Sequence, residues 1–184
     1  MAQGALALVV GPSGAGKDTL IAAAREALED DARYTFPRRI VTRRAFVTLE
    51  DHDTLDVDTF RKQRLRGAFA LDWDAHGLSY ALPASIDAAM VAGRVVVANV
   101  SRAIIPRAVE KYERCHVLLV TATPEVRAAR LIARGRESPD DVAERLAREG
   151  ATLPAGIMPI VIDNSGSLED GVRRFVKALA DIAK

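Results

Sequence analysis

The sequence contains little of what several classes of protein require. Its 184 residues include a single cysteine, Cys115, which excludes an internal disulfide framework and suits a reducing, cytoplasmic location. No apolar run approaches the roughly 20 residues of a membrane-spanning helix. The formal net charge of +1 offers no general attraction to nucleic acid or to a membrane surface, so we expect neither as a partner. What remains, with 49% hydrophobic residues, is a chain able to bury a substantial core as one domain over residues 1–184.

The N-terminal region contains the pattern of a phosphate-binding P-loop. An apolar run at 5–10 leads into the sequence GPSGAGK at 11–17, which is followed by a helical pattern. Glycines let several main-chain N–H groups converge on one anion, and the helix adds its positive N-terminal end. We therefore predict a nucleoside triphosphate site. Its expected contacts are Gly11, Ser13, Gly14, Ala15, Gly16, Lys17, Asp18 and Thr19.

The P-loop departs from the usual pattern at one position. Asp18 follows Lys17, where a Ser or Thr hydroxyl normally binds Mg²⁺. A carboxylate is a hard oxygen ligand that also suits Mg²⁺, directly or through water. Thr19 is the alternative source of the hydroxyl. Both residues are therefore candidate metal ligands, and the sequence does not decide between them.

Strand-like apolar runs alternate with helical patterns along most of the chain. This order predicts an α/β, three-layer P-loop NTPase fold with a mostly parallel sheet of about five strands. The expected strands are 5–10, 39–42, 94–99, 116–121 and 158–162, and the expected helices are 17–28, 83–92, 124–134, 140–148 and 167–182.

Two segments depart from this rhythm. Residues 36–82 contain a predicted helix at 58–66 and two short strand-like runs at 69–73 and 78–81. We interpret this segment as a substrate-binding insertion on the rim of the sheet. Residues 135–150 are rich in charge and poor in apolar side chains, and we interpret them as a lid.

Arginine is concentrated near the predicted site, although the total charge is balanced. The candidate phosphate-binding residues are Arg39 and Arg43 before the insertion, Arg102 after a strand, and Arg130, Arg134 and Arg145 around the lid. The planar guanidinium forms paired, charge-assisted hydrogen bonds with phosphate. Two other interpretations stay open: the lid arginines as an ordinary solvated helix face, and Arg39 and Arg43 as charges that protect an edge strand.

The strand at 94–99 lacks an acidic residue at its end, which indicates what kind of group accepts the phosphoryl group. Kinases that act on hydroxyl groups generally need a base, often Asp, but the strand at 94–99 ends in Asn99. A phosphate acceptor needs no such base because it is already ionised at neutral pH. The pattern therefore favours an acceptor that carries phosphate.

The insertion adds further candidates for substrate contacts. His76 and Tyr80 lie in the run 73–80, in which Trp73 is expected to pack rather than react. His52 belongs to the cluster at 50–52, which is either a loop for ribose hydroxyls or Mg²⁺, or an exposed turn.

Several of these motifs resemble guanylate kinase. The resemblance lies in GPSGAGK, in Thr42-Arg43, in the run 73–80 and in the lid arginines, and the segment 163–164 resembles the adenine-side loop, which implies a nucleotide contact for Asn164. The chain departs from that family at Asp18, Ala81 and Asn99. Asp72 falls where that family places a guanine-reading glutamate.

The same positions resemble a related family more closely, the ribose 1,5-bisphosphate phosphokinases of phosphonate breakdown. The shared motifs are Gly-Lys-Asp at 16–18, 39–43, 50–52, 73–80, 99–102 and 134–137, spread over nearly the whole chain. The resemblance implies a guanylate-kinase-like fold and transfer of the ATP γ-phosphoryl group to a phosphorylated sugar, with Mg²⁺. The product is 5-phospho-α-D-ribose 1-diphosphate.

The resemblance also implies a role for each candidate residue. Lys17 would hold the ATP phosphates, and Arg130, Arg134 and Arg145 would close over the transferring group. Substrate phosphates would be bound by Arg39, Arg43 and Arg102, and the ribose site would be lined by His52, Asp72, His76, Tyr80 and Asn99. Two alternatives stay open: a guanylate or other nucleoside monophosphate kinase, and a non-catalytic binding module. A homodimer is also left open.

Overall fold

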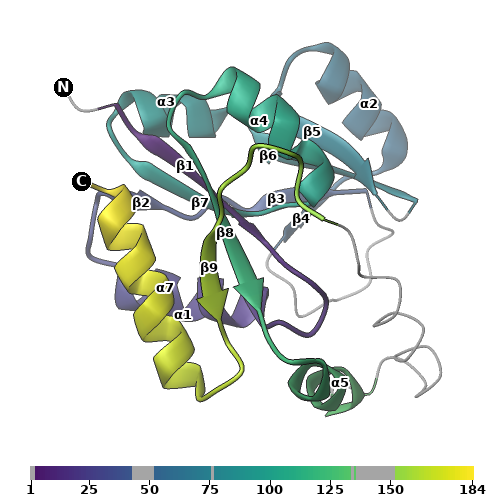
Figure 1. The fold of residues 1–184 in the computed structure, drawn as a ribbon. Coiled ribbons are helices and arrows are strands. Elements are labelled where there is room, and N and C mark those ends of the chain that lie inside the picture. Colours follow the sequence, from purple (N-terminus) through teal and green to yellow (C-terminus); the bar gives the residue numbers. More distant parts are fainter. Residues whose placement is uncertain (1–2, 43–51, 76, 134, 136–151) are drawn as a thin grey trace.

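The main sheet consists of five parallel strands in the order β2-β7-β1-β8-β9. The computed structural model describes residues 3–42, 52–75, 77–133, 135 and 152–184 (Figure 1). The strands are β1 (Ala5–Val10), β2 (Tyr34–Thr35), β7 (Val95–Asn99), β8 (Cys115–Thr121) and β9 (Ile160–Asp163). The predicted parallel sheet of about five strands is confirmed.

Both faces of this sheet are covered, which explains why its central strand is apolar throughout. All six residues of β1 are buried. Ala5, Ala7 and Val9 face one core, which is completed by α1 (Lys17–Ala27) and α7 (Leu168–Ile182). Leu6, Leu8 and Val10 face a second core beneath α3 (Ser85–Val91) and α4 (Ile105–Lys111). Side chains alternate between faces along a strand, so a strand covered on both sides shows an unbroken apolar run.

Residues 39–83 contribute a second, smaller sheet in the order β4-β3-β6-β5. Its strands are β3 (Arg39–Val41), β4 (His52–Thr54), β5 (Phe69–Ala75) and β6 (Leu78–Pro83), and α2 (Val57–Leu65) belongs to the same segment. Leu71, Trp73 and Leu82 from this sheet pack into the second core. The small sheet is thereby fixed against the main one.

Three expectations need correction. The strand at 39–42 lies in the small sheet, and the fifth strand of the main sheet is β2, whose two residues are too few to give a pattern. Pro83 ends β6, paired with Phe69, and the helix begins at Ser85. The sequence patterns did not predict the short 3-10 helix η1 (Arg102–Ile104) or α4, whose buried residues are Ile105 and Ala108.

The remaining helix boundaries agree closely with the sequence patterns. α5 (Pro124–Ala133) begins at the predicted proline. Ser167 caps α7, accepting a hydrogen bond from the main-chain N–H of Asp170 at 3.1 Å. The predicted helix at 140–148 and nearly all of the predicted lid lie outside the described residues. Among the helices that are described, none is long and apolar enough to cross a membrane.

Candidate functional site

The glycine-rich segment between β1 and α1 folds as a tight loop. Gly11, Gly14 and Gly16 have φ angles of +150°, +78° and +90°, which L side chains rarely adopt. Gly16 is the N-cap of α1 and offers no side chain to satisfy the first-turn N–H groups. Such a helix start attracts anions through its N–H groups and its dipole. The loop therefore has the backbone of a phosphate site.

Lys17 folds back over this loop. Its Nζ donates to the carbonyl oxygens of Gly11 at 2.7 Å and Pro12 at 3.0 Å. The Lys17 ammonium group is therefore held against the loop by two main-chain carbonyl groups.

Asn164 is buried beneath the loop. It is 2% exposed, and its Nδ2 donates to the carbonyl oxygen of Ala15 at 2.8 Å. A Cβ atom on Gly16 would lie 2.5 Å from this Nδ2, and one on Gly171 would lie 2.2 Å from its Oδ1. The amide is enclosed by backbone on both sides. Asn164 therefore supports the P-loop from below, and its contact with a nucleotide stays a prediction.

Arg130, expected at the transferring phosphoryl group, also contacts the loop. Its guanidinium donates to the carbonyl oxygens of Ala15 at 3.4 Å and of Asn164 at 2.9 Å. In this arrangement it stabilises the junction of the P-loop with the segment before α7. Four other predicted site residues, Arg43, His76, Arg134 and Arg145, lie outside the described residues.

The structure joins two candidates that the sequence treated separately. β1 and β7 are parallel neighbours in which Val9 pairs with Asn99, so both strands end at the same edge of the sheet. There the Nδ2 of Asn99 donates to Oδ1 of Asp18 at 2.6 Å. Asn99 therefore orients the Asp18 carboxylate, and its place in a ribose site stays a prediction. Thr19 is exposed in the same first turn of α1.

A second polar group gathers on one face of the small sheet. Arg39 and His52 are register neighbours on β3 and β4, and the Arg39 guanidinium lies 5.2 Å from the centroid of the Tyr80 ring. Tyr80 in turn stacks on Trp73 at 5.6 Å and 10°. Arg39 Nε and His52 Nδ1 are buried without a hydrogen-bond partner in the part of the chain that is described. Buried polar atoms normally have partners, so this group has the character of a ligand site.

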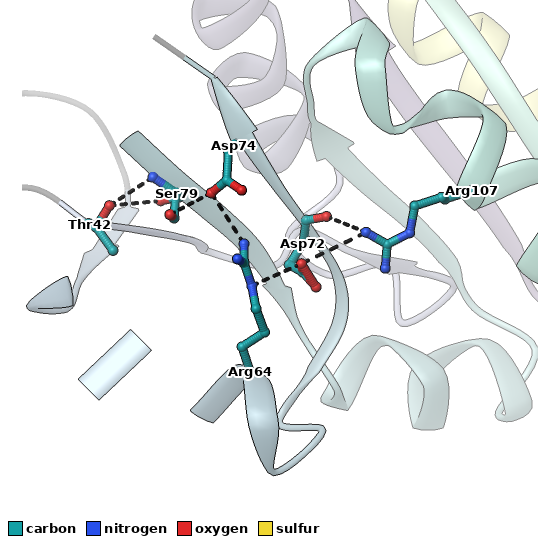
Figure 2. A network of polar contacts seen from close by, with 6 residues as sticks. All are labelled: Thr42, Arg64, Asp72, Asp74, Ser79 and Arg107. Carbon is teal, nitrogen blue, oxygen red and sulfur yellow. Dashed lines mark hydrogen bonds and ion pairs between the residues drawn. The ribbon is translucent and has the colours of Figure 1, made fainter. Parts of the chain in front are cut away.

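Asp72 does not belong to that group. It precedes Trp73 on β5, and neighbouring residues of a strand point to opposite faces. Its carboxylate instead pairs with Arg64 of α2 at 3.1 Å, and Arg107 of α4 donates to its carbonyl oxygen at 2.8 Å (Figure 2). Two guanidinium groups thus contact Asp72, and its role in a ribose site stays a prediction.

This network continues across the small sheet. Arg64 also pairs with Asp74 at 3.3 Å, and the Ser79 hydroxyl donates to Asp74 at 2.6 Å (Figure 2). The Ser79 bond, followed by Arg64, lowers the pKa of the Asp74 carboxyl. Ser79 N–H in turn donates to the hydroxyl of Thr42 at 2.8 Å. The network links α2, β5, β6 and the end of β3.

One arginine that reaches the P-loop was not among the predicted site residues. Arg127 on α5 donates from Nε to the carbonyl oxygen of Ser13 at 3.0 Å. A signal was present, because Arg127 stands three residues before Arg130 and such pairs share a helix face.

The described residues also limit how a metal ion could be held. Among them, no group of three or more His, Cys, Asp and Glu side chains could hold a metal ion. Asp18 is an exposed carboxylate beside the phosphate-binding loop. Mg²⁺ typically binds proteins through one or two carboxylates, with phosphate and water oxygens completing the shell. The residues present therefore fit a Mg²⁺ ion that arrives with a nucleotide.

Two relatives of known sequence share one name. No family model matches the chain. The chain is 50% identical over 182 residues to "Ribose 1,5-bisphosphate phosphokinase PhnN" of Chelativorans sp. (strain BNC1), covering 98% of this chain and 87% of the relative. It is 47% identical to the protein of the same name from Methylobacterium radiotolerans, covering 96% and 97%.

Solved structures show the same fold at low identity. The guanylate kinase from Anaplasma phagocytophilum has a TM-score of 0.69 at 16% identity, covering 98% of this chain and 86% of that one. A gluconokinase from Sinorhizobium meliloti 1021 has a TM-score of 0.55 at 16% identity, covering 100% and 95%. The predicted guanylate-kinase-like fold is confirmed.

Proposed function

The chain belongs to the ribose 1,5-bisphosphate phosphokinase family, and we propose that it transfers the γ-phosphoryl group of ATP to the 1-phosphate of α-D-ribose 1,5-bisphosphate. A phosphate oxygen of the acceptor forms a bond to the γ-phosphorus as the bond to the ADP leaving oxygen breaks. The products are 5-phospho-α-D-ribose 1-diphosphate and ADP. One domain over residues 1–184, with the segment at 135–150 as its lid, carries the reaction.

The observation that carries this proposal is the arrangement at the carboxyl edge of the main sheet. The P-loop, with Lys17 folded over it, lies beside Asp18, whose carboxylate is held by Asn99. Lys17 and the loop amides bind the donor phosphates. Asp18, or Thr19, holds Mg²⁺, which neutralises phosphate charge.

The acceptor side needs cations rather than a base. The phosphate nucleophile is already ionised at neutral pH, so no residue has to remove a proton. Arg39, His52 and Tyr80 form one polar group on the small sheet, and Arg102 follows the strand that ends in Asn99. These residues bind and orient the substrate phosphates and ribose. Catalysis rests on positioning and charge neutralisation.

Acceptor choice tests the proposed function directly. We expect ADP release with ribose 1,5-bisphosphate, and at least about 100-fold slower release with guanosine monophosphate. The Asp72 carboxylate already pairs with Arg64, so it is not available to bind the guanine base. A coupled ADP assay measures both rates, and mass spectrometry identifies the diphosphate product. Faster turnover of guanosine monophosphate would contradict the proposal.

The metal ligand is tested by a matched pair of variants. Asp18→Asn keeps an oxygen that can accept the Asn99 hydrogen bond but removes the charge. We expect the half-saturating Mg²⁺ concentration to rise about tenfold or more, with a smaller rise for Thr19→Val, because Asn99 orients Asp18. Titration of Mn²⁺ into the ATP complex, followed by electron paramagnetic resonance, measures the affinity independently of turnover.

Asp58→Asn, an exposed change on α2, is the control for these variants. A larger effect of Thr19→Val than of Asp18→Asn would assign the ligand to the hydroxyl instead.

A further inference from the structure

Arg127 and Arg130 contact the P-loop from the same helix. Arg127 Nε donates to the carbonyl oxygen of Ser13 at 3.0 Å, and Arg130 donates to that of Ala15 at 3.4 Å. Residues three apart on a helix share a face. The two arginines can therefore both reach the loop, where the carbonyl groups they contact are two residues apart. α5 thus contacts the outer side of the loop at two points.

The helix backbone itself lies against the loop at Gly14. A Cβ atom on Gly14 would lie 2.8 Å from the carbonyl oxygen of Arg127 and 3.1 Å from its Cβ. No side chain fits between loop and helix at this point. The close approach lets the Arg127 side chain reach Ser13.

Almost every other carbonyl of the loop is also held. Lys17 contacts Gly11 and Pro12, Asn164 contacts Ala15, and the N–H of Leu20 donates to Gly16 at 3.0 Å. The peptide unit is planar, and its C=O and N–H point in opposite directions. The donors on the Ser13 and Ala15 carbonyl groups therefore fix the directions of the Gly14 and Gly16 N–H groups. The Ser13 carbonyl shares its peptide plane with the N–H of Gly14.

We propose that Arg127 is a positioning residue of the P-loop, which aims the Gly14 N–H at the nucleotide phosphates by holding the Ser13 carbonyl. This inference rests on the proposed function, because it requires a nucleotide at the loop. Burial, followed by the nearby Arg102 guanidinium, lowers the pKa of Arg127.

The test asks whether Arg127 orients the P-loop for nucleotide binding or instead contacts the transferring phosphoryl group. Arg127→Met keeps the length of the stem and removes the donors. We expect the Kd values for ATP and ADP, measured by calorimetry, to rise about tenfold or more together. The acceptor KM stays unchanged, and kcat at saturating ATP changes less than about threefold, since the chemical step uses other residues. Arg173→Met, on the exposed face of α7, is the control.

Arg127→Lys separates geometry from charge. Lysine keeps the charge but lacks the planar guanidinium, so we expect at least about a threefold rise in the ATP Kd. This variant also carries the test if Arg127→Met does not fold.

Three results would overturn the inference: wild-type ATP affinity in either variant, a large fall in kcat at unchanged Kd, or a lower unfolding temperature with unchanged affinity of the folded protein. Failure of the wild-type protein to bind ATP would instead overturn the proposed function.

Discussion

Replacing Lys17 with methionine is expected to lower kcat by about 10²- to 10³-fold, because in the proposed mechanism the Lys17 ammonium neutralises charge on the donor phosphates. Methionine keeps a straight side chain of similar length, so α1 and the loop backbone should persist. The two hydrogen bonds from Nζ to Gly11 and Pro12 are lost with the charge. Initial rates at saturating ATP and acceptor measure the effect, and circular dichroism checks the fold.

Lys177→Met is the matched control for this prediction. Lys177 is exposed on α7 and pairs with Asp181 at 2.7 Å, away from the loop. Its replacement should leave kcat unchanged. Near-normal turnover in Lys17→Met would remove the P-loop lysine from the mechanism, whereas an equal loss in both variants would point to a general effect on stability.

The largest expected loss of stability comes from Gly11→Ala. The φ angle of +150° is strained for alanine, and its Cβ would lie 2.1 Å from the carbonyl oxygen of Val120. Val120 belongs to β8, the neighbour of β1, and is fully buried, so backbone rather than a flexible side chain would have to move. We expect the free energy of unfolding to fall by about 3 to 5 kcal/mol. Urea denaturation followed by circular dichroism measures it.

Gly156→Ala separates the cost of backbone strain from the cost of the clash with Val120. Gly156 also has a positive φ, +83°, but nothing lies within 4 Å of its added Cβ. Backbone strain alone predicts a loss of about 1 kcal/mol. Similar losses in the two variants would mean that the close approach of β1 and β8 contributes little.

The strands of the main sheet and the P-loop were predictable because each carries its own local signal. A strand buried on both faces must be apolar along its whole length, as β1 is, and glycines with a following lysine mark a phosphate loop. The strand β2 was not predicted, because its two residues are too few to give a pattern.

The candidate site was predicted in composition but not in arrangement. Arg39, His52 and Tyr80 do gather on one face of the small sheet. Asp72 was expected with them, yet strand alternation places it on the other face, beside Arg64. Which side chains share a face with Tyr80 depends on the register between β5 and β6. The position of Asp72 relative to Tyr80 could therefore be predicted only once that register was known.

The sequence by itself determined the phosphate chemistry of this protein: glycines, a lysine and a surplus of arginines near strand ends suit anions and little else. Only the tertiary structure decided which partner each group holds. Asn99 meets Asp18 across 81 residues, Arg127 meets Ser13 across 114, and Asn164 meets Ala15 across 149. A local pattern reports whether a residue is buried, but contacts between distant residues arise only when packed strands and helices bring their ends together.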